Sequence, residues 1–278
     1  MRIEEAAEQF AIHLQLEGRP KTTRDNYGYV VRRLARRFPH MPVSKLKGSE
    51  LHEYIAELGE SVSHNALTCY TLELRVFFRW LVENGYMKEN PLDRFRTHRE
   101  PLPPVTPFTK EEAARLMEAI QTPFERAVLM LLMDCGLRAS ELCNLKLEDI
   151  DLRAGELIVR KGKGGKSRRL ALNARPRRAL VEYLRGRGQL DGLLWPAQWQ
   201  RKQLSWALDK LARRAKVYRV YPHRFRHSWA IELRREGVDI LVIQQLLGHS
   251  SIQMTLRYVA FCEQEIAVEV HRQHPIAS

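Results

Sequence analysis

Residues 221–230 read Tyr-Pro-His-Arg-Phe-Arg-His-Ser-Trp-Ala, and residues 246–258 read Leu-Leu-Gly-His-Ser-Ser-Ile-Gln-Met-Thr-Leu-Arg-Tyr. In the first segment we expect Pro222 to open a helix, because proline is favoured at the first helical position. His223 and Arg226 then share one face of the first turn, since residues three apart are neighbours on a helix. A histidine and an arginine placed in this way can grip one phosphate group.

The second segment predicts the end of one helix and the start of another. Gly248 and His249 follow an apolar run directly, and glycine is the residue that most often closes a helix. Tyr258 falls nine positions after His249, on the following helix. Taken alone, His249 fits a core or capping histidine equally well, and Tyr258 fits a packed aromatic residue better than a nucleophile.

Two further basic segments lie upstream. Residues 136–142 read Gly-Leu-Arg-Ala-Ser-Glu-Leu, so Arg138 stands at the start of a short predicted helix. Residues 156–172 contain two apolar runs around Gly-Lys-Gly-Gly-Lys, a pattern that predicts a β-hairpin with lysines at its tip. That tip lacks the full pattern of a nucleotide-binding loop, which leaves an ordinary turn as the alternative. The alternative for Arg138 is an ordinary basic residue at a helix start, without a role in function.

Taken together, these segments resemble the tyrosine recombinase family, that is, the phage integrases of the Xer type. The motifs occur in the family's order and approximate spacing, and the resemblance extends over nearly the whole chain. It implies a mainly helical fold with a small β-sheet or hairpin, in which an all-helical core-binding (SAM-like) domain precedes a tyrosine-recombinase catalytic domain. The catalytic residues implied by the resemblance are Arg138, Lys163, His223, Arg226, His249 and Tyr258.

The resemblance makes Tyr258 the nucleophile. Its attack on DNA would leave a 3′-phosphotyrosyl bond and a free 5′-hydroxyl. Arg138 and Arg226 suit the neutralisation of the phosphate oxygens, because guanidinium is a planar and permanently charged fork that matches phosphate geometry. Such a clamp acts by preorganised electrostatics on the charge that grows in the transition state.

The family's general-acid lysine matches Lys163 best, and Lys161 and Lys166 are close rivals at the same hairpin tip. An ammonium group there would protonate the strongly basic leaving oxygen. The other roles implied are proton removal assisted by His223, a hydrogen bond from His249 to the phosphate, and orientation of the basic residues by Glu141.

Periodicity and a proline-rich stretch divide the chain into three parts. Residues 1–98 carry apolar side chains at helical spacing, which predicts a small helical module, and the resemblance implies that it binds DNA. Residues 99–107 contain four prolines and predict an extended linker. Residues 108–278 form the expected catalytic domain, with a tail helix at the C-terminus.

Capping residues mark the start of two predicted helices. Thr22 or Thr23 is expected to cap the second helix of the N-terminal module. In the catalytic domain, Thr109 and Glu112 have the spacing of a capping box.

The chain is strongly basic. Its 278 residues include 46 Lys and Arg against 33 Asp and Glu, a formal net charge of +13. This surplus indicates a polyanionic partner, which the resemblance specifies as double-stranded DNA with specific recombination sites. A protein that merely happens to be basic is the alternative. Scattered cysteines, no signal-peptide pattern and no long apolar run favour a cytoplasmic, nucleoid-associated protein without membrane contact.

We expect neither a cofactor nor a metal ion. The four cysteines form no pair at metal-ligand spacing, and no tight carboxylate cluster is present. Cations gathered around one phosphate would also repel a divalent ion. In the implied reaction the phosphotyrosyl bond stores the energy of the broken diester, so ATP is not required.

The implied function is site-specific recombination through a phosphotyrosyl intermediate and a Holliday junction. Four protomers would act on two duplexes, with the tail after Cys262 exchanged between neighbours. The alternatives are a type IB-like topoisomerase, which uses the same chemistry on a single duplex, and a non-catalytic sequence-specific DNA-binding protein. Neither the target sequence nor the biological role follows from the residues.

Overall fold

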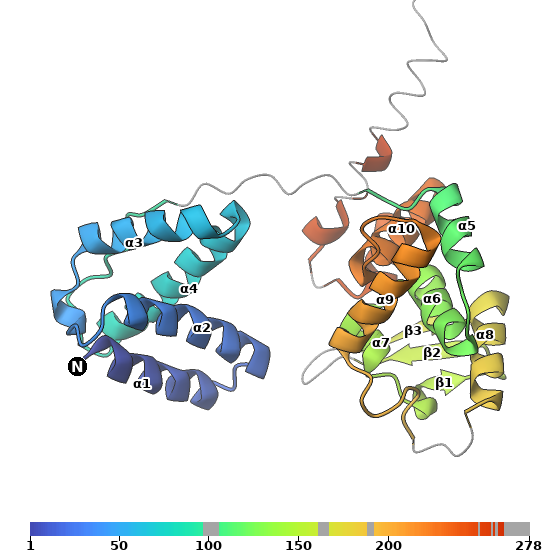
Figure 1. Cartoon of the computed structure of the whole chain (residues 1–278), viewed down its shortest axis with the longest axis horizontal. Helices are drawn as coiled ribbons and strands as arrows, with labels where there is room; N and C mark the ends of the chain where they lie inside the picture. Colours follow the sequence, from blue (N-terminus) through green and yellow to red (C-terminus); the bar gives the residue numbers. More distant parts are fainter. Residues whose placement is uncertain are drawn as a thin grey trace, which may run out of the picture. The chain divides into compact units, whose positions relative to one another are not determined.

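The computed structural model describes residues 1–96, 106–160, 167–187, 192–249, 251–256, 258 and 261–263. The chain divides into two compact units, Met1–Leu102 and Pro103–Ser278 (Figure 1). The described residues are mainly helical and include one three-stranded sheet, which confirms the expected fold class. Most of the predicted linker at 99–107 lies outside the described residues. None of the described helices combines the length and hydropathy needed to cross a membrane.

The first unit is a small bundle built around aromatic side chains. Phe10 is buried, and its ring lies 5.3 Å from that of Phe77 and 5.4 Å from that of Trp80, measured between ring centroids. Large aromatic side chains in edge-to-face and tilted contacts of this kind dominate the packing of a small core. The elements are α1 (Ile3–Leu16), α2 (Lys21–Arg37), the 3-10 turn η1 (Val43–Lys45), α3 (Gly48–Ser61) and α4 (His64–Glu83).

The predicted threonine cap of the second helix is wrong. Helix α2 begins at Lys21, directly after Pro20, so Thr22 and Thr23 lie inside its first turn. Pro20 occupies the N-cap position with φ −54°, and no side chain caps this helix end.

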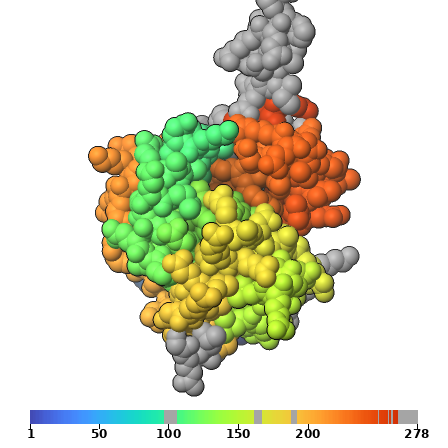
Figure 2. All heavy atoms as spheres, turned by 90° about the vertical axis from the view of Figure 1, so that its right-hand side faces the viewer, coloured from blue at the N-terminus to red at the C-terminus, as the bar shows by residue number. Residues whose placement is uncertain are grey.

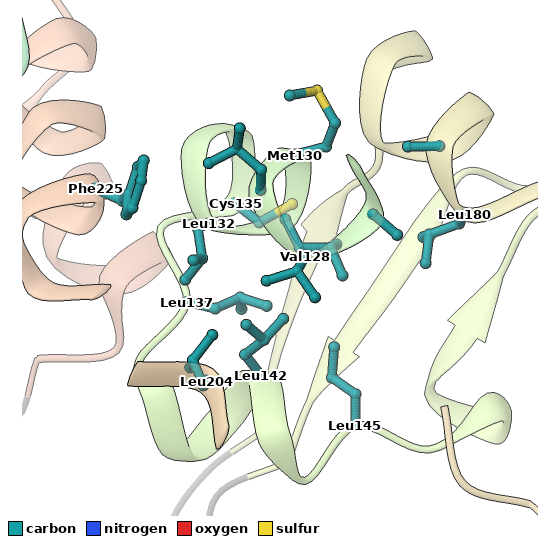
Figure 3. Packing of buried hydrophobic residues seen from close by; sticks show 14 of the residues in the cluster. Val128, Met130, Leu132, Cys135, Leu137, Leu142, Leu145, Leu180, Leu204 and Phe225 are labelled. Carbon is teal, nitrogen blue, oxygen red and sulfur yellow. The ribbon is translucent and has the colours of Figure 1, made fainter. Parts of the chain in front are cut away.

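Helix α6 (Pro123–Cys135) lies at the centre of the second unit. Every side chain from Ala127 to Leu132 is buried, as a helix surrounded by other elements requires. Figure 3 shows this core, in which side chains of α6 meet Leu142, Leu180, Leu204 and Phe225 from four other helices. Those helices are α7 (Ala139–Cys143), α8 (Ala174–Arg185), α9 (Arg201–Ala215) and α10 (Pro222–Arg235).

The sheet packs on the same core. Strands β1 (Ile150–Asp151), β2 (Glu156–Val159) and β3 (Arg168–Ala171) are antiparallel in the order β1-β2-β3. In the β2–β3 hairpin, Leu157 lies opposite Leu170, and both are buried. The tip of the hairpin at 161–166 is outside the described residues.

Helix α5 (Lys110–Glu118) opens the second unit with the predicted capping box. The Thr109 hydroxyl accepts a hydrogen bond from the Glu112 amide, and the Glu112 carboxylate accepts one from the Thr109 amide, both at 3.1 Å. Figure 2 shows α5 in green beside α8 in yellow, and Met117 and Arg178 from these helices line one pocket. Helices α10 and α11 (Ile240–Leu247), in orange and red, border the same face.

Candidate active site

A left-handed turn after α6 positions Arg138. Helix α6 ends at Gly136, whose φ is +55°. A Cβ atom on this residue would lie 2.2 Å from the ring of Trp229 on α10, so glycine is required both for the turn and for the close approach. The chain then enters α7, with Arg138 as the N-cap residue. Arg138 therefore stands where α6 ends and α7 begins, next to α10.

Glu141 is the centre of a cluster of basic side chains. Its carboxylate accepts hydrogen bonds from the Arg138 guanidinium (2.6 Å) and from the Arg138 backbone amide (2.9 Å). Arg168 on β3 binds both carboxylate oxygens, at 2.9 and 2.8 Å, and Arg226 Nη1 lies 3.9 Å away. Burial raises the pKa of Glu141, but the contacts with Arg168 and Arg138 outweigh it and hold the pKa at about 2.

The Arg226 side chain on α10 forms hydrogen bonds with the C-terminal ends of two other helices, α6 and the helix that ends at Leu247. Its side chain is 1% exposed, and Nη1 donates to the Gly136 carbonyl at 2.7 Å while Nη2 donates to the Leu247 carbonyl. Burial and the nearby charge of Arg138 lower the pKa of Arg226 to about 9, so the guanidinium remains protonated at neutral pH. Arg138 contributes a parallel link, because its Nη2 donates to the Gly248 carbonyl at 3.0 Å.

Helix α11 ends, as predicted, at Gly248, which has φ +63°. The next residue, His249, is 8% exposed, and its Nδ1 lies 2.9 Å from the Thr255 hydroxyl. Burial and the positive charges of Arg226 and Arg138 lower the pKa of His249 to about 3. His249 is therefore a neutral imidazole at physiological pH.

Tyr258 lies in the same site and adopts helical backbone geometry, as predicted. Its side chain is 2% exposed, and the phenol oxygen is 2.8 Å from Nδ1 of His227 on α10. The rings of Tyr258 and His249 are stacked, with centroids 6.3 Å apart and an interplanar angle of 23°. An ionised phenol would raise the pKa of Arg226, so the two groups lie within electrostatic reach of each other.

Comparison with known proteins identifies the family. The model of the phage integrase family matches residues 107–265, which is more than half of the chain. The chain belongs to the phage integrase family. Tyrosine recombinase XerA of Pyrococcus furiosus is 31% identical over 277 residues, covering 96% of this chain and 93% of the relative. Tyrosine recombinase XerC of Myxococcus xanthus is 31% identical over 304 residues, covering 97% of each.

A solved structure has the same fold as this family member. The integrase of transposon Tn1549, in complex with a circular intermediate DNA, aligns with a TM-score of 0.78 at 20% sequence identity. The alignment covers 93% of this chain and 95% of the integrase. Together with the relatives, this likeness confirms the resemblance in the sequence: the chain is a tyrosine recombinase of the integrase and Xer type.

The described part of this integrase-family site contains five of the six residues expected to be catalytic. His223 is at the exposed edge, in the first turn of α10, where its ring stacks on that of His227 with centroids 5.7 Å apart. Crowding by protein atoms and the charges of Arg226 and Arg138 lower the pKa of His223. Lys163 and its two rivals lie outside the described residues. The guanidinium groups of Arg138, Arg168 and Arg226 surround Glu141, and the charge of Arg226 reaches His249 and Tyr258.

Two members of the site were not assigned from the sequence. Arg168 alternates with Leu170 and Leu172 along the second strand of the hairpin, so it belongs to the strand's inward face. An arginine on an inward face needs an acidic partner, but the alternation does not show which residue that partner is. His227 is four residues after His223, so the two share a helix face, which the same periodicity could have indicated.

The spacing of His223 and His227 also occurs in helical pairs of metal ligands. The expectation of no metal site also assumed that no two histidines lie four positions apart, and this assumption is wrong, because His223 and His227 have that spacing. Across the part of the chain that the structure describes, no group of three or more His, Cys, Asp or Glu residues could hold a metal ion.

Arg224 does not contact Glu141 as Arg226 does, although the two arginines are only two residues apart. The sequence placed its charge between the paired residues His223 and Arg226. Its guanidinium instead donates to the carboxylate of Glu112 at 2.6 Å and lies 4.0 Å from the centre of the Phe108 ring. Arg224 therefore anchors α10 to the start of α5, away from Glu141.

Proposed function

We propose that this chain is a site-specific recombinase that cleaves and rejoins double-stranded DNA through Tyr258, without metal or ATP. One observation carries the proposal. Arg138 and Arg226 come from separate elements and meet at the carboxylate of Glu141, while the charge of Arg226 reaches both His249 and Tyr258, whose phenol oxygen lies 2.8 Å from a histidine nitrogen.

The two arginines are proposed to bind the non-bridging oxygens of the scissile phosphate. Arg138 and Arg226 each use two N–H groups in the hydrogen bonds given above, and a guanidinium has five. The remaining donors are held in place by those contacts, which is the preorganisation that stabilises growing negative charge. Glu141 serves this clamp by fixing Arg138 and by offsetting part of the repulsion between the cations.

His249 is proposed to donate a hydrogen bond to the same phosphate. Its pKa of about 3 keeps it neutral, so one ring nitrogen carries a proton and the other accepts. If the Thr255 hydroxyl donates to Nδ1, then Nε2–H is the donor directed to DNA. His223, at the exposed edge of α10, is proposed to contact the phosphate and to assist removal of the phenol proton.

Tyr258 is proposed as the nucleophile that forms the 3′-phosphotyrosyl bond. A free phenol has a pKa of about 10, so the surrounding guanidinium charges favour its ionisation. Because Tyr258 is 2% exposed in the DNA-free chain, attack requires a rearrangement that opens the site to the phosphate. We propose that assembly on DNA drives this rearrangement, and that Lys163 then protonates the leaving 5′-oxygen.

The proposed substrate is a pair of DNA duplexes bound by four protomers, which exchange strands through a Holliday junction. The net charge of +13 supports DNA as the partner, as does the likeness to the Tn1549 integrase, whose structure was solved in complex with a circular intermediate DNA. Exchange of the C-terminal tail between protomers remains a prediction, since residues 264–278 lie outside the described residues. Truncation before Gln264 should then abolish assembly and exchange.

The test begins by selecting bound sites from random duplexes, because the target sequence is unknown. A nicked duplex carrying the selected site is then incubated with the protein and run on a denaturing gel. We expect a band of covalent protein–DNA adduct, and none from Tyr258→Phe. A two-site exchange assay and a plasmid relaxation assay complete the set, since relaxation without exchange would indicate a topoisomerase. Binding without any adduct would refute the proposal.

A further inference from the structure

The hydroxyl of Tyr258 has a defined partner on α10. Its oxygen lies 2.8 Å from Nδ1 of His227, and the two ring centroids are 5.5 Å apart. We propose that His227 accepts the phenol proton during cleavage and returns it during rejoining. This inference rests on the proposed function and deepens it, because it names the proton acceptor for the nucleophile.

The backbone holds His227 firmly in this position. It follows Arg226, whose guanidinium is tied to the carbonyls of Gly136 and Leu247, so the helix cannot slide without breaking those bonds. On the next turn, Ala230 and Ile231 are completely buried. A side chain on a helix anchored in this way keeps its distance to a partner better than one on a loop.

The other two histidines are placed less favourably for taking the proton. Nδ1 of His249 is engaged by the Thr255 hydroxyl, and a pKa of about 3 makes its imidazole a weak base. His223 stacks on the ring of His227, one turn closer to the start of α10. His223 can therefore assist the reaction through His227 and through the phosphate.

The proposed step conserves atoms and charge. The step requires the His227 tautomer in which Nδ1 accepts and Nε2 carries the proton. The hydrogen of the phenol moves from Tyr258 to Nδ1, so an imidazolium forms. The phenol oxygen forms a bond to phosphorus, and the bond from phosphorus to the 5′-oxygen breaks. The 5′-oxygen takes a proton from the general acid, which we assign to Lys163. Rejoining reverses each transfer.

The surrounding charges set the timing of the transfer. Arg138 and Arg226 stabilise the ionised phenol, and they oppose a positive charge on His227. A phosphate that gains negative charge during attack relieves this opposition. We therefore expect the phenol proton to move to His227 at the same time as the phenol oxygen attacks phosphorus.

The test compares His227→Asn and His227→Gln with the wild-type chain in covalent adduct formation. Asparagine can offer a hydrogen-bonding atom near the position of Nδ1, but neither replacement is basic. General-base catalysis contributes about 10²–10⁴-fold, so we expect losses of about that size in the cleavage rate. Affinity for the nicked duplex should stay unchanged. Glu232→Gln, a charge change on the exposed side of α10, is the matched control and should cleave normally.

A second phenol separates proton transfer from a merely structural role. The chain is made with 3,5-difluorotyrosine at position 258, because its hydroxyl ionises more easily and depends less on a base. We expect the loss caused by His227→Asn to shrink to about tenfold or less with this phenol, following the Brønsted dependence of base catalysis. An equal loss with both phenols, or no loss with either, would overturn the inference.

This design distinguishes the inference from the function on which it rests. If the wild-type chain forms no adduct, the proposed function itself fails. If the wild-type chain forms adduct and the two His227 variants do so at the same rate, only the role of His227 is refuted. Should His227→Asn not fold, His227→Gln combined with difluorotyrosine gives the same comparison.

Discussion

Glu141 lies within hydrogen-bond distance of the guanidinium groups of Arg138 and Arg168 and 3.9 Å from that of Arg226. Three positive charges against one negative charge leave an excess of two (3 − 1 = 2) in a largely buried place. A cluster of this composition is stable enough to fold and still attracts a phosphate, which carries one negative charge. In the proposed function, the carboxylate thus serves both folding and phosphate binding.

We predict that Glu141→Gln destabilises the second unit by about 3 kcal/mol, because removing one partner of a buried ion pair leaves the other charges uncompensated. Urea unfolding followed by circular dichroism measures the effect. Glu148→Gln is the matched control, since Glu148 is 57% exposed and pairs with Lys146 and Arg160 at the surface. That change should cost less than about 1 kcal/mol. Equal costs at both positions would contradict this account.

His249 makes stability depend on pH in a defined direction. Its pKa is about 3 in the folded chain against 6.5 for a free histidine, so the unfolded chain binds the extra proton between these values. The contribution of neutral His249 to the free energy of unfolding is therefore fully present above pH 6.5 and is lost as the pH falls toward 3. We expect the free energy of unfolding of wild type, relative to His249→Asn, to fall by about 1.4 kcal/mol per pH unit. Parallel profiles of the two chains between pH 4.5 and 6 would exclude this role.

At the level of elements, the site depends on where helices α6 and α11 end. Helices α6 and α11 both stop at a glycine with positive φ, and the carbonyls near these ends bind Arg226 and Arg138. The guanidinium groups therefore supply hydrogen bonds that the last carbonyls of a helix otherwise lack. The two side chains of the proposed phosphate clamp therefore also hold these helix ends.

Gly136→Ala should be more harmful than a positive φ alone explains. Its Cβ would lie 2.2 Å from the Trp229 ring, whereas a Cβ at Gly237, where φ is +82°, meets no atom within 4 Å. Both substitutions carry a strain of about 1–2 kcal/mol, and overpacking adds about 1–3 kcal/mol at Gly136 alone. Thermal and urea unfolding of the two variants should show this difference. Equal stabilities would mean that the close approach to Trp229 has no energetic weight.

The elements could be predicted from the sequence wherever a local signal was strong. The capping box at Thr109 and the glycine stop at Gly248 are contacts between residues close in the chain, and both are confirmed. The short strand β1 was missed because two residues carry no periodic pattern. The contact of Arg224 with Glu112 could not be predicted, because the two residues are more than a hundred positions apart and sequence spacing does not show which way a side chain points.

The site was predictable to a similar extent. The order of Arg138, His223, Arg226, His249 and Tyr258 suggested a phosphate clamp, and the structure brings these residues to one region. The contact of Arg168 with Glu141 depends on how the hairpin packs on α7, a tertiary relation that no spacing encodes. Helical spacing places His227 on the same face as His223, but only the structure shows that it contacts the phenol.

At the scale of the whole molecule, the excess of positive charge should make DNA affinity depend strongly on salt concentration. On α2, Arg36 is exposed, whereas Arg37 is held by two hydrogen bonds to Glu57 at 2.9 and 2.8 Å. We predict that Arg36→Ala lowers the slope of log affinity against log salt by about 1, the effect of losing one phosphate contact. Arg37→Ala should change the slope less. Identical slopes for both variants and wild type would remove α2 from the DNA-binding surface.

The central claim concerns one oxygen atom, and one measurement tests it most directly. The wild-type chain is incubated with a nicked duplex of a selected site, the DNA is trimmed with nuclease, and the peptides are sequenced by mass spectrometry. We expect a nucleotide linked through its 3′-phosphate to the peptide that contains Tyr258, and no such product from Tyr258→Phe. A nucleotide on any other residue, or adduct of equal amount from Tyr258→Phe, would contradict the assignment.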